Sequence, residues 1–343
     1  MLFPKRTDYT KTISSITLGS TQTFELTREF AIESLVLKIV VTTSAVMATA
    51  NADGLARLLK RVQLQIADGS RTRNVVDVEG PSLLEYHRHA VGAVDSSTAT
   101  AYVANGTTTY TLFYPLHCAH PQIADPIGST LLLPVYRYNN NPVLTLQFAN
   151  QAEMDQNATP TFAISACTAS VIVNRRDTTG VRDFRTFDWE LAELSQNYPT
   201  TGNAQLYELQ VPGSYTGLLM KAYTGATAAQ ARGDISNGEF RLQALGNVLR
   251  RFRLADLEAE NQWSMFRPTT PTINGSYYLD FLTDRAGEGV AELGSVLDAN
   301  VIAQTGARLQ LLQDLTGNTA AKINYVTHRI FGVLDDLKLA KTK

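Results

Sequence analysis

Two stretches of the chain repeat each other, and this repeat limits the folds that the sequence can adopt. Without a gap, residues near the N-terminus match residues 183 positions further on. The matched pairs are Gly19 and Gly202, Gln22 and Gln205, Phe24 and Tyr207, Glu25 and Glu208, Leu26 and Leu209, Leu35 and Leu218, Leu37 and Met220, and Lys38 and Lys221. One folding unit that is present twice explains these matches.

A second block extends the repeat at a separation of 190 residues. Residues 59–62 then lie over 249–252, and Leu64 lies over Leu254. A short helix is expected after this block in each half, at 81–89 and at 255–266. We therefore predict a duplicated unit of roughly 150 residues.

Alternating apolar and polar residues predict that the unit is built from β-strands. The expected strands are rich in Val, Ile, Thr, Tyr and Phe, and turn-forming residues separate them. They cover residues 23–26, 35–41, 62–66, 110–114, 143–148, 169–173, 206–211, 218–223, 252–254, 277–281, 307–312 and 323–333. Many short strands separated by turns favour two β-sandwiches over a parallel α/β fold.

The composition excludes several classes of protein. Of 343 residues, 44% are hydrophobic and 18% are charged, and the net charge is -2. This balance excludes nucleic-acid binding through bulk positive charge and a disordered chain. Two cysteines exclude a disulfide framework beyond one bridge. No apolar run reaches the roughly 18 residues of a membrane span, and residues 1–11 lack the apolar segment of a secretory signal, so we expect a soluble protein that is not exported.

These patterns divide the chain into five parts. Residues 1–12 are an expected N-terminal arm, and 13–177 form the first sandwich. Residues 178–198 are an expected linker, because turn-forming residues gather there between the two repeats. The second sandwich covers 199–336, and a basic tail covers 337–343.

Several stretches resemble one family of viral proteins. They are a strand at 32–41, a basic pair before an alternating run at 58–68, an aromatic strand with a proline at 110–116, and Leu144-Thr145-Leu146-Gln147-Phe148-Ala149-Asn150 near an asparagine-rich turn. In this order, and with the duplication, the sequence resembles the double jelly-roll major capsid proteins of tailless icosahedral viruses, the tectivirus and adenovirus lineage. The resemblance covers most of residues 13–335.

The resemblance implies an all-β structural protein with two tandem eight-stranded jelly-roll sandwiches and a few short helices. Three chains are expected to form a trimer whose six sandwiches make a nearly hexagonal block that tiles a virion shell. The virus is expected to be a bacteriophage, assembled in the host cytoplasm. Expected partners are copies of the chain, penton or membrane-associated proteins and a lipid membrane under the shell. No enzymatic activity, cofactor or sequence-specific nucleic acid is expected.

Two basic pairs, Arg175-Arg176 and Arg250-Arg251, are the candidate contact residues. Arginine suits ion pairs at interfaces, so we expect these side chains to form ion pairs with a neighbouring chain in the trimer or between the two sandwiches. The resemblance also implies that both chain termini lie at the inner face of the shell. The candidate residues there are Lys5, Arg6, Lys338, Lys341 and Lys343.

One cluster has the character of metal ligands. His117, Cys118 and His120 are close in sequence, and His87 and His89 lie in the first expected helix. Zinc requires three or four convergent nitrogen or sulfur ligands, and the sequence supplies no second pair at ordinary zinc spacing. We interpret these residues as parts of the rim of the first sandwich and expect no metal.

Two other functions stay open on sequence alone. A carbohydrate-binding or adhesive tandem of β-sandwiches requires export and aromatic residues at loop tips. A cupin-like enzyme requires a His-x-His motif on a strand, whereas His87-Arg88-His89 lies in an expected helix. Trimer formation, glycan binding and metal content distinguish the three functions.

Overall fold

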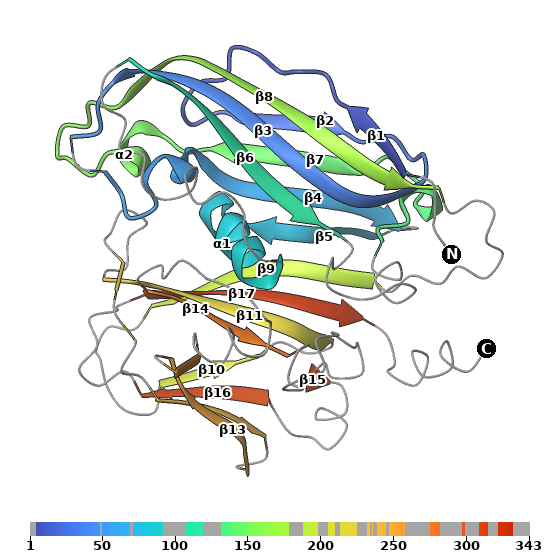
Figure 1. Ribbon diagram of the computed structural model, residues 1–343, viewed down its shortest axis with the longest axis vertical. Helices are drawn as coiled ribbons and strands as arrows, with labels where there is room; N and C mark the ends of the chain where they lie inside the picture. Colours follow the sequence, from blue (N-terminus) through green and yellow to red (C-terminus); the bar gives the residue numbers. More distant parts are fainter. Residues whose placement is uncertain are drawn as a thin grey trace. The chain divides into compact units, whose positions relative to one another are not determined.

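The computed structural model divides into two compact units, each of which is a β-sandwich (Figure 1). Unit 1 comprises Met1–Pro121 and Asp125–Thr186, and unit 2 comprises Gln122–Ala124 and Phe187–Lys343. The residues that the structure describes are 5–48, 50–68, 71–91, 107–118, 132–177, 188–197, 205–209, 213–224, 232–233, 235, 239–244, 247–254, 256–257, 275–281, 297–298, 309–314 and 322–331.

The described residues of unit 1 form eight strands in two antiparallel sheets. The strands are β1 (Lys5–Tyr9), β2 (Thr21–Glu25), β3 (Ala31–Ala45), β4 (Leu59–Asp68), β5 (Arg71–Val78), β6 (Thr109–His117), β7 (Val143–Phe148) and β8 (Ala163–Arg176). One sheet has the order β1-β8-β3-β6, and the other has the order β2-β7-β4-β5. Most consecutive strands thus lie in different sheets, and most neighbours within a sheet are distant in sequence, which is the topology of a jelly roll.

Unit 2 repeats this topology. Its strands are β9 (Asp188–Asn197), β10 (Gln205–Glu208), β11 (Ser214–Tyr223), β12 (Glu239–Ala244), β13 (Asn247–Arg253), β14 (Ser276–Asp280), β15 (Leu297–Asp298), β16 (Leu309–Asp314) and β17 (Lys322–Phe331). The sheets have the orders β9-β17-β11-β14 and β10-β16-β12-β13, and the short β15 pairs with β11. Apart from β15, the strands take the same places as in unit 1, so the expectation of two tandem eight-stranded jelly rolls is confirmed.

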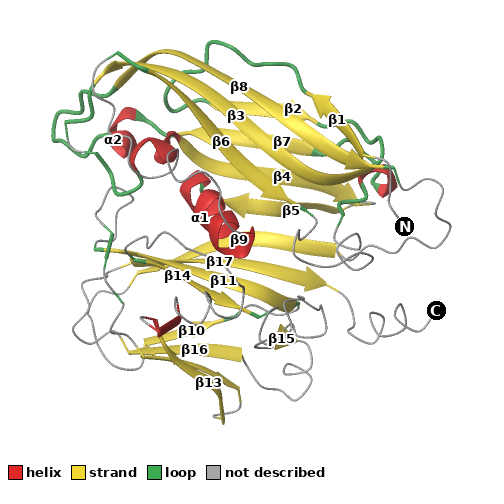
Figure 2. Cartoon of the chain, viewed as in Figure 1, coloured by secondary structure: helices red, strands yellow, loops and turns green. Residues whose placement is uncertain are grey.

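Helices are few and short (Figure 2). Within the described residues they are α1 (Gly80–Val91), α2 (Gln151–Met154) and the 3-10 turns η1 (Gly54–Leu58) and η4 (Val135–Arg137). α1 confirms the helix expected at 81–89, whereas most of the helix expected at 255–266 lies outside the described residues. A capping box between Asn150 and Glu153 starts α2. In the described part of the chain, no helix combines the length and the apolar character that crossing a bilayer requires.

Each sandwich buries the apolar residues of its alternating strands. Leu35 on β3 and Leu218 on β11 are both 0% exposed, as the repeat predicts for equivalent core positions. Leu37 and Leu146 also face the interior of unit 1, as expected. In unit 2, Tyr207 on β10 stacks on the ring of Tyr325, with 3.7 Å between the ring centroids; its counterpart in the repeat, Phe24 on β2, is buried as well.

The second block of the predicted repeat is wrong, because it matches residues that lie on strands in different positions of the two jelly rolls. Residues 59–62 lie in β4, the fourth strand of unit 1, whereas 249–252 lie in β13, the fifth strand of unit 2. The fourth strand of unit 2 is β12. A basic pair followed by an alternating apolar run occurs in many strands, so this short pattern does not identify a strand's position in the sheet. The block at a separation of 183 residues does match second and third strands correctly.

Two strands lie where the sequence predicted an arm and a linker. β1 lies within residues 1–12, β9 lies within residues 178–198, and each begins its jelly roll. Their sequences are Lys-Arg-Thr-Asp-Tyr and Asp-Trp-Glu-Leu-Ala-Glu-Leu-Ser-Gln-Asn, which contain few β-branched residues. Backbone pairing with β8 and β17, which are distant in sequence, holds them in the sheets.

Candidate functional site

The N-terminal segment lies along the edge of β8 in unit 1. β1 pairs with β8 from Lys5 opposite Arg176 to Tyr9 opposite Ile172. Beyond β1, the backbone N–H groups of Thr10, Ile13 and Ile16 donate to carbonyl groups at Val171, Ala169 and Cys167, at 2.9, 2.8 and 3.1 Å. The segment therefore follows most of β8 and closes one side of the sandwich.

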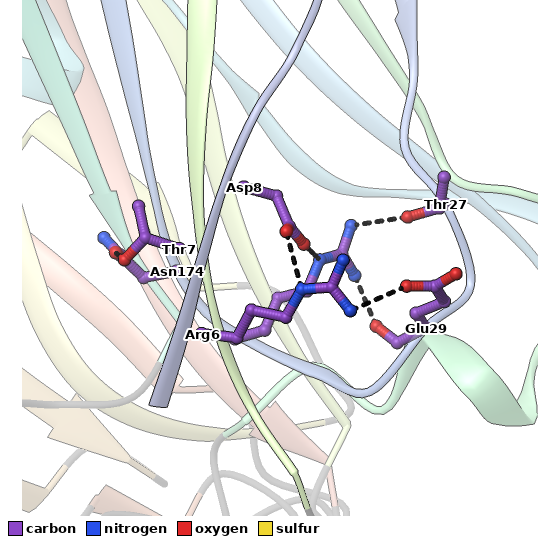
Figure 3. Close-up of polar contacts among 7 residues, drawn as sticks. Arg6, Thr7, Asp8, Thr27, Glu29 and Asn174 are labelled. Atoms are coloured by element: carbon purple, nitrogen blue, oxygen red, sulfur yellow. Dashed lines mark hydrogen bonds and ion pairs between the residues drawn. The ribbon is translucent and has the colours of Figure 1, made fainter. Parts of the chain in front are cut away.

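Arg175 on β8 fastens this segment to the rest of unit 1. Its Nε donates to Asp8 Oδ2 at 2.9 Å, its Nη1 to the carbonyl oxygen of Glu29 at 2.5 Å, and its Nη2 to Thr27 Oγ1 at 3.1 Å. Asp8 belongs to β1, whereas Thr27 and Glu29 belong to the connection between β2 and β3 (Figure 3). One guanidinium thus joins three segments that are far apart in the sequence.

A second, more exposed layer surrounds this contact (Figure 3). Arg6 Nε donates to Asp8 Oδ1 at 2.8 Å, and Arg6 Nη1 lies 3.3 Å from Glu29 Oε2. Thr7 Oγ1 donates to Asn174 Oδ1 at 2.9 Å. Asp8 therefore contacts two arginines. The Arg175 side chain is 2% exposed, whereas the Arg6 side chain is 55% exposed.

The burial of Arg175 differs from its expected place at an interface between chains. Burial lowers the pKa of its guanidinium, and the charge of Asp8 opposes this shift; an arginine remains protonated in either case. Since its three donor groups bond within unit 1 and its side chain is covered, Arg175 acts as an internal clamp. The sequence alone contained no sign of this, because Asp8 and Thr27 lie about 150 residues or more before Arg175.

We expect Asp8→Ala to lower the free energy of unfolding of unit 1 by about 1–3 kcal/mol, because it leaves a buried guanidinium without its carboxylate. Arg6→Ala is the matched control, since it removes the exposed ion pairs of the same carboxylate, and such pairs contribute roughly 0–1 kcal/mol. Urea unfolding followed by circular dichroism measures both changes. Equal losses for the two variants would contradict the clamp.

Two of the other predicted arginines, Arg176 and Arg251, keep part of their side-chain surface exposed. Arg176 forms an ion pair with Glu33 at 2.7 Å, and its side chain is 26% exposed. Arg251 forms an ion pair with Glu239 at 3.2 Å, and its side chain is 58% exposed. Arg250 pairs through its backbone with Leu242. Contact of these three residues with a neighbouring chain stays a prediction.

The candidate residues of the inner face are only partly described. Lys5 and Arg6 lie on β1. Lys338, Lys341 and Lys343 lie outside the described residues. Their place at the inner side of a shell stays a prediction.

Part of the histidine and cysteine cluster is a packing contact between α1 and β6. The backbone N–H of His117 donates to His87 Nε2 at 3.4 Å, and the two ring centroids are 5.3 Å apart. Cys118 is buried, which raises the pKa of its thiol. His120 lies outside the described residues. Among the residues that are described, no three His, Cys, Asp or Glu side chains gather where they could hold a metal ion.

Two hollows follow the N-terminal segment in unit 1. The larger, of about 790 Å³, lies between residues 14–18 and the start of β8, and the smaller, of about 430 Å³, lies between 10–14 and β2. The residues that line the larger hollow include Ser14, Ser15 and Cys167 but no acid or histidine. Burial raises the pKa of Cys167 to about 12, so this thiol is protonated at neutral pH and is a poor nucleophile.

Comparison with known proteins identifies solved structures that have a similar fold. No protein-family profile and no curated protein sequence matches the chain. Among solved structures, the chain is similar to the STIV MCP, of Sulfolobus Turreted Icosahedral Virus, with a TM-score of 0.68 and 14% identity over 97% of this chain and 99% of the other. It is also similar to the PBCV-1 virus capsid, with a TM-score of 0.63 and 15% identity over 97% of this chain and 96% of the other.

A third similar structure comes from a bacteriophage. It is the major capsid protein P2 from Bacteriophage PM2, with a TM-score of 0.60 and 10% identity over 96% of this chain and 98% of the other. All three similarities span both jelly rolls. The chain therefore has the double jelly-roll fold over almost its entire length.

Proposed function

We propose that this chain is the major capsid protein of an icosahedral virus. The observation that carries the proposal is the strand order, which is the same in both units and which makes the chain similar along 97% of its length to the STIV MCP. The PM2 neighbour is likewise a major capsid protein. On this proposal the chain is a virion component with a structural role and no enzymatic one.

The proposed assembly is a homotrimer. Three chains with two similar sandwiches each supply six similar blocks, so threefold symmetry approximates a hexagon that tiles a surface. With 18% charged residues and a net charge of -2, the chain repels its own copies weakly. Contacts with penton and membrane-associated proteins, a lipid membrane under the shell and assembly in the host cytoplasm are further parts of the proposal.

The oligomeric state tests this function. Light scattering of the purified chain, at micromolar concentration and moderate salt, should give three times the mass of one chain. Electron microscopy of the same sample should show nearly hexagonal particles. A monodisperse monomer would count against the capsid function, and binding on a glycan array would favour an adhesive protein instead.

A further inference from the structure

A lysine, an asparagine, a serine and a glutamate share one face of the sheet β9-β17-β11-β14 in unit 2 (Figure 1). Lys221 on β11 lies directly opposite Asn324 on β17, and Ser195 on β9 lies opposite Asn324 on its other side. Residues that are directly opposite in antiparallel strands have their side chains on the same face. Glu193 lies two residues before Ser195 along β9 and shares that face. All four residues belong to strands of unit 2, so strand pairing within this unit brings them together.

Two hydrogen bonds hold the side-chain amide of Asn324. Its Nδ2 donates to Glu193 Oε1 at 2.6 Å, and its Oδ1 accepts from Ser195 Oγ at 2.9 Å. Asn324 is fully buried, and Glu193 is 6% exposed. The carbonyl carbon of this amide, Cγ, therefore lies between a hydroxyl group that donates to its oxygen and a carboxylate that contacts its nitrogen.

Lys221 brings a primary amine to the same place. It is fully buried, and its Nζ lies 5.6 Å from the centroid of the Tyr223 ring, one row further along β11. The Cβ atoms of directly opposite residues are about 4.5–5.5 Å apart, so a change of rotamer along the flexible lysine stem brings Nζ to Cγ of Asn324. An amine attacks a carbonyl carbon in its neutral form, and removal from water favours the neutral form of a lysine.

We propose that Lys221 and Asn324 form an intramolecular isopeptide bond, which joins β11 covalently to β17. Nζ of Lys221 attacks Cγ of Asn324, and the Ser195 hydroxyl group stabilises the negative charge that develops on Oδ1. The Glu193 carboxylate accepts a proton from the attacking nitrogen and passes it to Nδ2, which it already contacts at 2.6 Å. The bond between Cγ and Nδ2 then breaks, ammonia leaves, and a secondary amide remains. No oxidant, reductant or further reactant takes part.

The corresponding row of unit 1 has a serine in place of the asparagine. At the repeat separation of 183 residues, Lys38 on β3 corresponds to Lys221 on β11. The residue opposite Lys38 on β8 is Ser170, whose side chain has no amide for an amine to attack. The duplicated lysine therefore meets the reactive partner in unit 2 and not in unit 1, and the repeat supplies a natural control.

The bond fastens the last strand of unit 2 to its third strand. Lys221 and Asn324 are far apart in the sequence, so the bond closes a long loop and reduces the conformational freedom of the unfolded chain. It leaves the backbone pairing of β11 with β17 in place, because it joins side chains on one face of the sheet. The bond forms within one chain, so the proposal goes beyond the capsid function and does not depend on it.

Mass spectrometry of the unchanged, denatured chain tests the proposal. We expect the mass of the chain to fall short of the mass of its sequence by one molecule of ammonia. After digestion, we expect a branched peptide in which Asn324 acylates Nζ of Lys221, and trypsin should not cleave after Lys221. A mass without this loss overturns the proposal. Loss of ammonia without the branched peptide also overturns it, because an asparagine that cyclises with its own backbone loses ammonia too.

Variants assign the roles of the side chains. Lys221→Arg and Asn324→Ser should each abolish the loss of ammonia, and Asn324→Ser copies the serine of unit 1. Glu193→Gln keeps a hydrogen-bonding group beside Nδ2 but cannot take up a proton, so we expect it to slow bond formation by about a hundredfold or more. A time course of intact mass after cell-free synthesis measures this rate. Bond formation at an unchanged rate in Glu193→Gln overturns the role of the carboxylate.

Two lysine variants of unit 1 are the matched controls. Lys38 occupies the same place in the repeat, and Lys60 lies 2.6 Å from Glu153 Oε1, but its side chain is 41% exposed. Lys38→Arg and Lys60→Arg should both keep the loss of ammonia, and a branched peptide that contains either lysine overturns the assignment to Lys221. Circular dichroism checks that each variant folds, and the mass of the unchanged chain decides the proposal where a variant does not. A trimer without the bond overturns this proposal and leaves the capsid function standing.

Discussion

Leu146→Ala will lower the free energy of unfolding of unit 1 by about 2–5 kcal/mol. Leu146 is 0% exposed at the centre of β7, between Gln22 on β2 and Val62 on β4. Its truncation removes apolar contacts on the inner side of the sheet and leaves a cavity, because close-packed sheets relax only partly into the vacated space. Urea unfolding followed by circular dichroism measures the loss.

Thr145→Ala is the control for this prediction. Thr145 is the preceding residue on the same strand, and its half-buried side chain points away from the core. Its truncation should change the free energy of unfolding by no more than about 0.5 kcal/mol. Wild-type stability of Leu146→Ala would mean that the inward face of β7 is assigned to the wrong residues.

Lowering the pH from 7 to 5 will destabilise unit 2 by about 2 kcal/mol through His328. His328 is buried on β17, where its Nδ1 lies 2.5 Å from Thr216 Oγ1 and its ring centroid lies 5.6 Å from that of Trp189. Burial lowers the pKa of His328 from 6.5 to about 4. The folded unit therefore keeps this histidine neutral at pH 5, whereas the unfolded chain binds a proton below about pH 6.5, so stability falls as the pH falls.

His328→Gln isolates this contribution from that of other titrating groups. The variant should lose less stability than the unchanged chain between pH 7 and pH 5, whatever its stability at pH 7. The chain has two tryptophans, so a Trp263→Phe background makes fluorescence report on Trp189 alone during urea unfolding. Identical pH dependence with and without His328 would contradict a buried neutral histidine.

The long, buried strands could be predicted from the sequence because their side-chain period is visible locally. β3, β7 and β8 alternate between interior and exterior residues along their length. β9 shows the opposite case: its Glu-Leu-Ala-Glu-Leu segment favours a helix by intrinsic propensity. Pairing of all ten β9 residues with β17 overrides that propensity.

For the candidate contact residues too, local sequence predicted some features and folding decided others. Local sequence identified Arg175 as a charged residue at the end of a strand, but its contacts with Asp8, Thr27 and Glu29 depend on folding. Those contacts make it an internal clamp. Arg176, the next residue, points to the other side of the strand and pairs with Glu33. Side chains alternate between the two faces of β8, so Arg175 points into the clamp and Arg176 points to the opposite face.

By itself, the sequence determined the all-β class, the duplication and the core positions Leu35 and Leu218, because alternation and repeats are local properties that the chain order preserves. Only the tertiary structure decided that β1 and β9 begin the two jelly rolls. It alone also decided that Lys221 is buried while the corresponding Lys38 is half-buried. Strand pairing and burial depend on segments that are distant in sequence, and no local pattern records which of them meet.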